Sequence, residues 1–338
     1  MKATASVIVV TYRRPEHLRT CLTHLAALHT APEQITVVDG SPDERTAQIV
    51  RGEFPRVAYL RNELGPGTTA ESRQIGFAAT IGDVIAYVDD DAFVEPDWLD
   101  ELLRPYDDPD VVGVGGRTLN GLEGEESKGV GHIGLLMPDG TLTGNFAADS
   151  GQVIKVDHLL GANMSFRRSA IEAVDGIRGN YPGTCMCEES DISLRLGRAG
   201  GRLVFAPRAV VHHLGAPYGI GGKRFDRRWL YYSRRNHVVM LVRIYGWRDP
   251  ILGRYLATAL RSQGEYMRLA GNRLRGRDVE GATPWRAPVG AAAALTRSAA
   301  ELCGVLAGLP SAVKALRTDR RADRSRQGIQ PALTTART

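Results

Sequence analysis

Cysteines are scarce in this chain, and they form no recognisable pattern. The four, Cys21, Cys185, Cys187 and Cys303, are too few and too scattered for a disulfide framework. Cys185 and Cys187 lie close in sequence, but the second pair that a structural zinc site requires is missing. We therefore expect a protein of a reducing, cytoplasmic setting that holds no structural zinc.

Long apolar runs are also missing. The N-terminal sequence MKATASVIVVTYRRP has an apolar run of only about five residues, too short for a signal peptide, so we expect no export. The later stretch VGAAAALTRSAAELCGVLAGLP is interrupted by Arg297 and Glu301. We expect it to form a helix that packs on protein or lies on a membrane, rather than one that spans a bilayer.

The net charge of +5 hides an asymmetry between the two parts of the chain. Residues 1–216 have 20 Lys and Arg against 30 Asp and Glu (−10), and residues 217–338 have 23 against 8 (+15), which together give +5. The basic part has no nucleic-acid-binding motif and no interleaved aromatic residues, so we expect no nucleic acid partner. It would suit peripheral contact with an anionic membrane, although arginines on solvated helix faces are an equally simple explanation.

What the sequence does contain is a regular alternation of strands and helices. With 338 residues and 43% hydrophobic content, the chain can fill a large core. Apolar β-rich runs alternate with helical periodicity through the first 120 residues, which is typical of a doubly wound α/β sheet. The predicted strands are Ser6–Val10, Ile35–Asp39, Val57–Arg61 and Asp83–Val88, and a further strand has the sequence VVGVGG.

Polar residues follow each predicted strand, at the end where ligands of such sheets bind. They are Thr11 and Tyr12, Asp39, Asn62, and the triplet Asp89–Asp91. Because the carboxyl ends of parallel strands meet at one edge, we expect all four groups on one rim.

The carboxylate triplet requires nearby positive charge, because three adjacent ionised carboxylates repel one another. Alternate residues of a strand end point the same way, so Asp89 and Asp91 share a side and can hold a hard cation such as Mg²⁺ or Mn²⁺. The alternative is a solvated acidic turn that caps the following helix.

Two segments, YYSRRN and YGIGGKR, resemble the part that follows the catalytic core in rhamnosyltransferase-like members of the nucleotide-sugar-dependent glycosyltransferases of family 2. Seven further segments resemble family 2 in sequence and order. They are VIVVTYRRPEHL, VVDGSPDERT, RNELGPGTTAESRQIGFAAT, VIAYVDDDA, LLGANMSFRR, EESDISLRLGRAGGRLVFAP and VVHHLG. The resemblance implies a GT-A fold, a Rossmann-like mixed sheet flanked by helices, over residues 1–245, with a nucleotide-binding half (1–118) and an acceptor half (119–245). A helical extension (246–316) and a disordered basic tail (317–338) would follow.

The resemblance also implies a set of site residues. Nucleotide binding would fall to Thr11, Tyr12, Arg14, Asp39, Arg73, Asp89 and Asp90, and donor-sugar contacts to Gly161, Ala162 and Asn163. Asp91 would bind the metal together with His212, which we prefer to His213. Glu189 would be the general base, with Glu188 and Asp191 as neighbours, although these acids could instead simply cap a helix in which Asp191 pairs with Arg195. Arg234 or Lys223 could meet phosphates.

The implied reaction is inverting, metal-dependent transfer from a nucleotide-diphosphate sugar, with UDP or dTDP favoured, to an acceptor hydroxyl. Two alternatives stay open. A sugar nucleotidyltransferase would require an early glycine-rich, basic phosphate loop, and VVTYRRPEHL has no such glycines. A noncatalytic module held to a membrane by the basic C-terminal part is the other.

Overall fold

The chain forms two compact units. This computed structural model describes residues 3–213, 215, 226–275 and 287–334, with side chains described as far as residue 322. The first unit, here called the sheet unit, comprises residues 1–137, 142–181 and 188–221. The second, the helical unit, comprises residues 138–141, 182–187 and 222–338.

The sheet unit is built on one mixed β-sheet with the order β3-β2-β1-β4-β8-β6-β9-β5, and β7 also pairs with β9. Strands β3, β2, β1 and β4 are mutually parallel, whereas β8 runs antiparallel to β4 and to β6. The mixed α/β fold expected from the sequence is thereby confirmed. The strands are β1 Ala5–Thr11, β2 Gln34–Asp39, β3 Ala58–Arg61, β4 Val84–Asp89, β5 Ala92–Val94, β6 Val111–Leu119, β7 Ile154–Val156, β8 Asn163–Arg167 and β9 Arg202–His213.

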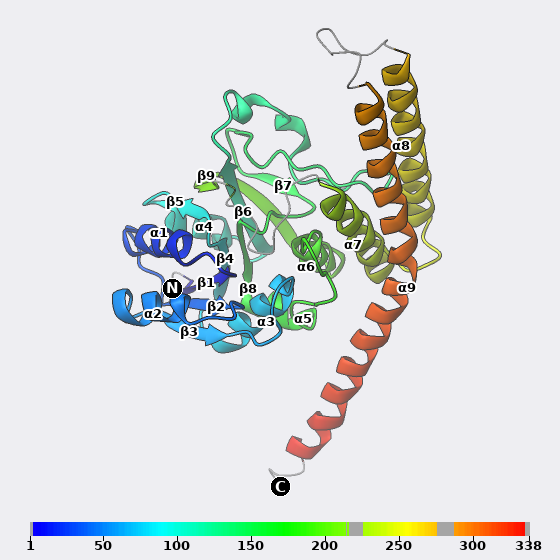
Figure 1. Cartoon of the computed structure of the whole chain (residues 1–338). Coiled ribbons are helices and arrows are strands. Elements are labelled where there is room, and N and C mark those ends of the chain that lie inside the picture. Colours follow the sequence, from blue (N-terminus) through cyan, green and yellow to red (C-terminus); the bar gives the residue numbers. More distant parts are fainter. Residues whose placement is uncertain (1–2, 214, 216–225, 276–286, 335–338) are drawn as a thin grey trace. The chain divides into compact units, whose positions relative to one another are not determined.

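Helices cover both faces of this sheet (Figure 1). Strand β1 shows why, because Val7 and Val9 point into one core and Ile8 into the other, as the two-residue period of a strand dictates. Helices α1, α2 and α4 pack on the first face, and α3, α5 and α6 on the second. Their bounds are α1 Pro15–Ala26, α2 Arg45–Glu53, α3 Thr69–Ala79, α4 Trp98–Leu103, α5 Arg168–Ala173 and α6 Glu188–Arg198, with short 3-10 turns at Arg104–Asp107, Glu125–Ser127 and Val130–His132.

The register of the parallel strands brings the polar strand ends together. Thr11 pairs with Asp39, Asp39 pairs with Arg61, and Val10 pairs with Asp89. The carboxyl ends of β1, β2, β3 and β4 therefore lie level with one another, which confirms the shared rim predicted from the sequence.

The helical unit contains α7 (Arg227–Tyr245), α8 (Pro250–Leu274) and α9 (Ala287–Thr334). Because α7 packs within this unit, the helical part begins before residue 246, earlier than the sequence suggested. Helix α9 continues to Thr334, whereas we expected an irregular tail from residue 317. Arginine, alanine and glutamine, which are good helix formers, make up half of residues 317–334, although Gly328 and Pro331 also lie in this stretch.

Asn163, at the start of β8, links three strands and a helix. Its side chain is fully buried, its Oδ1 accepts from Trp98 Nε1 at 2.9 Å, and its Nδ2 donates to the carbonyls of Arg117 (3.0 Å) and Ala209 (2.9 Å). These partners belong to α4, β6 and β9. The amide is thus fully engaged in the core, which argues against the donor-sugar contact expected of this side chain.

We predict that Asn163→Ala destabilises the protein by about 3 kcal/mol, because it leaves an indole N–H and two carbonyls buried without their partner. Urea unfolding followed by circular dichroism measures this loss. Gln152→Ala, at an exposed position, is the control and should change the free energy of unfolding by less than about 0.5 kcal/mol. Equal stability of the two variants would contradict the structural role of Asn163.

Candidate active site

The three carboxylates at the end of β4, Asp89, Asp90 and Asp91, have different surroundings. The Asp90 side chain is fully buried, Asp91 is 5% exposed, and Asp89 is 30% exposed. The Thr11 hydroxyl, at the end of β1, donates to Asp90 Oδ2 at 2.6 Å. Asp90 is therefore held in the protein interior, while Asp89 reaches the surface of the site.

The positive charge that the triplet requires comes partly from Arg14, at the start of α1. Its Nη2 lies 2.7 Å from Asp90 Oδ1, and its Nη1 donates to Asp91 Oδ2 at 2.8 Å. Burial raises the pKa of Asp90 to about 7, and the carboxylates of Asp91 and Asp89 add to this rise, while Arg14 and Thr11 oppose it. Arg14, expected to bind nucleotide, is thus engaged by the acids in this structure.

Asp89, Asp91 and His213 form a cluster that could hold a metal ion. Their ligand atoms all lie within 4.8 Å of one another, and His213 Nε2 is 3.3 Å from Asp91 Oδ1. Two carboxylates and one imidazole suit Mn²⁺, and the carboxylate oxygens equally suit Mg²⁺. The donor set therefore fits the cation expected from the sequence.

The neighbouring histidine, His212, points elsewhere. Its Nε2 lies 2.7 Å from Glu95 Oε1, and both side chains are nearly half exposed. The antiparallel pairing of β5 with β9 explains the difference, because His213 lies opposite Ala92, next to Asp91, whereas His212 lies opposite Phe93. Adjacent strand residues point to opposite sides. The structure therefore brings His213, and not the His212 that we preferred, beside Asp91.

Arg73, in α3, connects the triplet to two other elements. The guanidinium is 3% exposed, and Nη2 donates to Asp89 Oδ1 at 3.1 Å and to the Gly161 carbonyl at 3.0 Å. Nη1 forms an ion pair with Glu188 at the start of α6. One buried cation thus holds the ends of β4 and α6 and the loop before β8 around one point.

The two glutamates that begin α6 differ in accessibility. Glu188 is buried against Arg73, whereas Glu189 is only partly buried. Desolvation by the surrounding protein raises the pKa of Glu189 to about 7; its own backbone N–H and the charge of Arg73 oppose this rise, and the charge of Asp89 adds to it. Glu189 is therefore close enough to the Asp89–Arg73 pair to interact with it, and it can exchange a proton near neutral pH.

Asp191, the third acid of this helix start, has a structural environment. It is fully buried, Tyr181 Oη donates to its Oδ2 at 2.5 Å, and Arg195 Nε donates to its Oδ1 at 2.6 Å. Arg195 also reaches the carbonyls of Val174 and Gly176. These contacts match the helix pairing that we considered as the alternative for Asp191, and they anchor α6.

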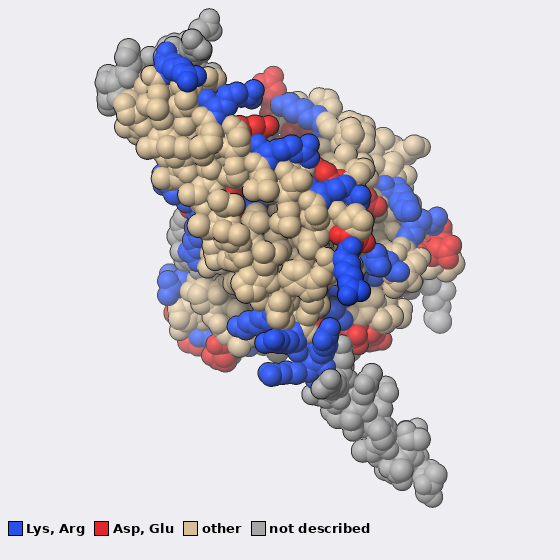
Figure 2. Space-filling view, turned by 90° about the vertical axis from the view of Figure 1, so that its right-hand side faces the viewer, with Lys and Arg blue, Asp and Glu red and all other residues tan. Residues whose placement is uncertain are grey.

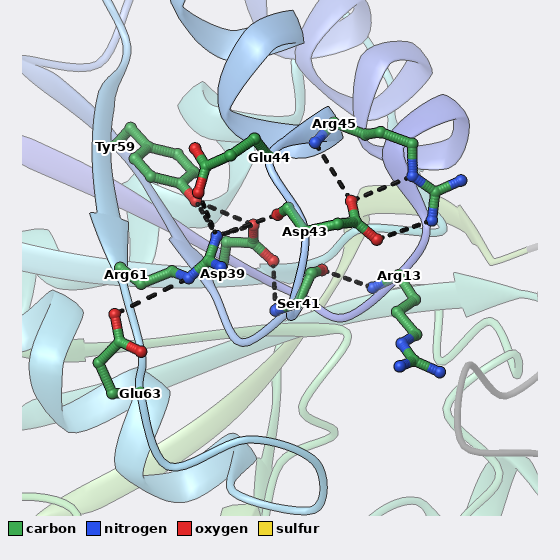
Figure 3. A network of polar contacts seen from close by, with 9 residues as sticks. All are labelled: Arg13, Asp39, Ser41, Asp43, Glu44, Arg45, Tyr59, Arg61 and Glu63. Atoms are coloured by element: carbon green, nitrogen blue, oxygen red, sulfur yellow. Dashed lines mark hydrogen bonds and ion pairs between the residues drawn. The ribbon is translucent and has the colours of Figure 1, made fainter.

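On the β2 side of the rim, Asp39 lies at the centre of a polar network (Figure 3). The side chain is fully buried, Oδ1 accepts from the Ser41 backbone N–H at 2.8 Å, and Oδ2 accepts from Tyr59 Oη at 2.9 Å. Arg61 Nη1 is 3.9 Å from Oδ2. Asp39 thus holds a fixed position, and a carboxylate with two acceptor bonds still has lone pairs for a ligand.

Tyr12 and Arg13 border the same network. The Tyr12 ring faces Gly40, where an added Cβ would lie 3.5 Å from ring atom Cδ2. Arg13 has a φ of 56°, uncommon for a residue with a side chain, and its backbone N–H donates to Ser41 Oγ at 2.7 Å (Figure 3). A side chain at position 40 would therefore begin in van der Waals contact with the ring.

Two further expectations concern the helical unit. Arg234 is ion-paired with Glu301 at 2.8 Å within that unit, so its charge is compensated there. Lys223, with the rest of YGIGGKR, lies outside the described residues.

The sequence did not indicate three residues that hold site acids in place, Tyr59, Ser41 and Tyr181. A hydroxyl or backbone donor far along the chain leaves no local pattern that indicates its acidic partner.

The sequence is similar to those of known glycosyltransferases. The model of the glycosyl transferase family 2 matches residues 6–175. A glucosyl-dolichyl phosphate glucuronosyltransferase of Haloferax volcanii is 28% identical over 221 residues, which cover 62% of this chain and 68% of that protein. A pre-mycofactocin glycosyltransferase of Mycobacterium tuberculosis is 29% identical over 208 residues, covering 62% of this chain and 42% of that protein. The succinoglycan biosynthesis protein ExoM of Rhizobium meliloti is 27% identical, covering 60% and 64%.

Solved structures show the same fold at low sequence identity. A mannosyltransferase of Pyrobaculum calidifontis in complex with GDP-Man and Mn²⁺ has a TM-score of 0.52 at 18% identity, covering 98% of this chain and 81% of that one. GalNAc-T7 with UDP, GalNAc and Mn²⁺ has a TM-score of 0.55 at 17% identity, covering 80% of this chain and 51% of that one. Both likenesses place the chain among GT-A folds.

We predict that His213→Ala weakens the binding of Mn²⁺ about tenfold or more, because it removes an imidazole from the Asp89–Asp91 cluster. Titration of the protein with Mn²⁺, followed by electron paramagnetic resonance, gives the dissociation constant. His212→Ala is the matched control, since its imidazole contacts Glu95, and it should leave the constant unchanged. A larger loss of Mn²⁺ affinity in His212→Ala than in His213→Ala would contradict this assignment of His213.

Proposed function

Because this chain belongs to glycosyl transferase family 2, we propose that it transfers a sugar from a nucleotide-diphosphate sugar to an acceptor hydroxyl, with inversion at the anomeric carbon. That the chain is a glycosyltransferase follows from the family. The donor class, the metal dependence and the inverting course are our proposals. The carrying observation is that Asp89, Asp91, His213 and Glu189 gather around one rim of the sheet.

Donor binding is assigned to the rim formed by β1, β2 and β4. We propose that Tyr12 packs against the base and that Asp39, held by Ser41 and Tyr59, accepts a hydrogen bond from the edge of the base. Asp89 and Arg73 would lie beside the ribose and the sugar, and Asp91 and His213 beside the diphosphate. A bound Mn²⁺ or Mg²⁺ would neutralise the charge that develops on the departing nucleoside diphosphate.

Glu189 is assigned the role of general base. Its pKa of about 7 leaves a substantial fraction as carboxylate at neutral pH, while keeping it basic enough to take a proton from an acceptor hydroxyl. The ion pair of Arg73 with Glu188, the residue before Glu189, would fix the start of α6 that carries the base. Gly161 and Ala162, beside Arg73, are the remaining candidates for contact with the donor sugar, through their backbone.

The finer choice of donor also belongs to this proposal. We favour UDP- or dTDP-linked sugars and a rhamnosyltransferase-like subtype on the motifs of the sequence. The structural neighbours were solved with GDP-Man and with UDP, so guanosine is the natural competitor in a test. The family match gives no support to the nucleotidyltransferase and noncatalytic alternatives.

We predict that kcat/KM rises with pH through about 7 and levels off above it, because only the Glu189 carboxylate can accept a proton and burial raises its folded pKa. Glu189→Gln should lower kcat by about 10² to 10⁴, and Glu172→Gln, at an exposed position of α5, should change little. The measurement is initial-rate transfer from pH 5.5 to 8.5 with saturating Mn²⁺. A flat profile, or less than tenfold loss in Glu189→Gln, would reject this base.

We predict that UDP or dTDP, but not GDP, stabilises the protein against heat, and only when Mn²⁺ is present. A ligand at about 100 times its dissociation constant adds about 2.7 kcal/mol, which is a shift of several degrees for a chain of this size. Differential scanning fluorimetry of each nucleotide with and without Mn²⁺ measures this. Equal shifts without metal would count against the metal role, and a shift with GDP alone would reassign the base.

A further inference from the structure

Helix α8 carries two parallel rows of exposed side chains. Large apolar residues recur every seven positions, and each is followed directly by an arginine. Seven residues are close to two helical turns, so each set forms a row along the helix. The apolar row is Leu260, Met267 and Leu274, and the arginine row is Arg254, Arg261, Arg268 and Arg275, the last directly after the helix.

Helix α9 adds a second apolar row beside the first. It packs antiparallel to α8, since Ser298 Oγ donates to Gln263 Oε1 and Arg273 Nη1 donates to the Gly290 carbonyl. The residues of α9 that meet α8 or α7 lie on its other sides. The exposed row is Leu295, Leu302, Leu306 and Val313, of which Leu306 is 57% exposed.

The two rows lie on one surface, on the side of α8 and α9 that is turned away from α7. Glu301 pairs with Arg234 of α7, and Gly304 lies directly against the Tyr231 backbone. By helical spacing, the exposed row of α9 lies opposite these contacts. The exposed row of α8 is turned away from Tyr255, which stacks on His237 of α7. Figure 2 shows a broad surface of uncharged residues with Lys and Arg along its borders. We call the two apolar rows with the arginine row of α8 the outer face.

The positive charge of the outer face is largely uncompensated among the described residues. Helix α8 has four arginines and one acidic residue, Glu265. The acids of α9 before residue 323 are Glu301 and Asp319, and both form ion pairs with α7 arginines. Further exposed cations lie toward the end of the α9 row, at Lys314, Arg317 and Arg320.

We propose that the outer face lies in the plane of an anionic bilayer surface, with the leucine and methionine side chains among the acyl chains and the arginines at the lipid phosphates. An amphipathic surface with aliphatic residues flanked by arginines binds in this way, through buried apolar area and attraction to anionic lipid. This inference concerns the helical unit and stands independently of the proposed reaction.

A lying orientation also fits α9. Among the described residues, its segment Ala287–Ala322 is the one long and apolar enough, by length and composition, to cross a membrane. Its polar side chains, however, hold it to its neighbours: Ser298 to Gln263, Glu301 to Arg234 and Tyr266, and Asp319 to Arg243. Crossing a bilayer alone would break these contacts inside hydrocarbon, whereas lying on the surface keeps them.

Other occupants fit the outer face less well. A second copy of the same face would bring its arginine row near another positive surface, and the like charges would repel. Single-stranded nucleic acid would find arginines, but its bases stack on aromatic rings, and the rows here are aliphatic.

Flotation of the full chain with vesicles tests the proposal. We expect binding to vesicles of 70% phosphatidylcholine and 30% phosphatidylglycerol, little binding to phosphatidylcholine alone, and weaker binding at 0.5 M than at 0.1 M NaCl. Arg261→Glu/Arg268→Glu should lower the partition coefficient about tenfold or more, and Leu260→Ser/Met267→Ser should lower it several-fold. Arg261→Lys/Arg268→Lys should keep it near the wild-type value.

Matched controls distinguish an effect of the outer face from a general effect of charge or of exposed apolar residues on vesicle binding. Arg56→Glu/Arg198→Glu makes the same charge change at exposed positions of the sheet unit, and Ile81→Ser/Leu122→Ser removes two exposed apolar residues there. Both should bind vesicles within about twofold of wild type. Absence of vesicle binding, equal loss in the controls, or a dimer in solution that Leu260→Ser/Met267→Ser dissociates would overturn the proposal.

Discussion

A single buried guanidinium, that of Arg73, holds the candidate site together. It bonds to Asp89 at the end of β4, to the Gly161 carbonyl before β8, and to Glu188 at the start of α6. These elements come from three separate parts of the chain, and each contributes a residue to the proposed chemistry. A buried cation with carboxylate partners is costly to leave unpaired, so the elements are coupled: displacing one would expose the charge of the others.

The same principle explains how three adjacent carboxylates are tolerated. Arg14 lies against Asp90 and Asp91, and Arg73 lies against Asp89. The pKa of Asp90 is still raised, because the effect of its burial is larger than that of Arg14. With these arginines in place, the ligand atoms of Asp89, Asp91 and His213 lie within 4.8 Å of one another. The fold thereby arranges a cluster that could hold a divalent cation. The guanidinium groups of Arg14 and Arg73 offset the negative charge around it.

The helical unit distributes its charge differently. Two of its acids, Glu301 and Asp319, form ion pairs with Arg234 and Arg243 of α7. Three arginines of α8, Arg254, Arg261 and Arg268, are exposed. Residues 217–338 have 23 basic and 8 acidic residues, an excess of +15. Two of these acids bind α9 to α7, and a seven-residue repeat sets arginines along one edge of an apolar face. Some charged residues of this part therefore hold α7 and α9 together, and others form an exposed basic row on α8.

The sequence by itself determined the α/β fold, the rim of polar strand ends, the cation requirement of the triplet and the family, because these depend on local period, strand-end position and motif order. Tertiary structure alone decided which histidine joins the cluster, since β9 is covered on both faces and its sequence does not reveal which side each residue takes. It likewise buried Asn163 in the core and paired Asp191 with Tyr181 and Arg195, because these partners come from distant segments that only packing brings together.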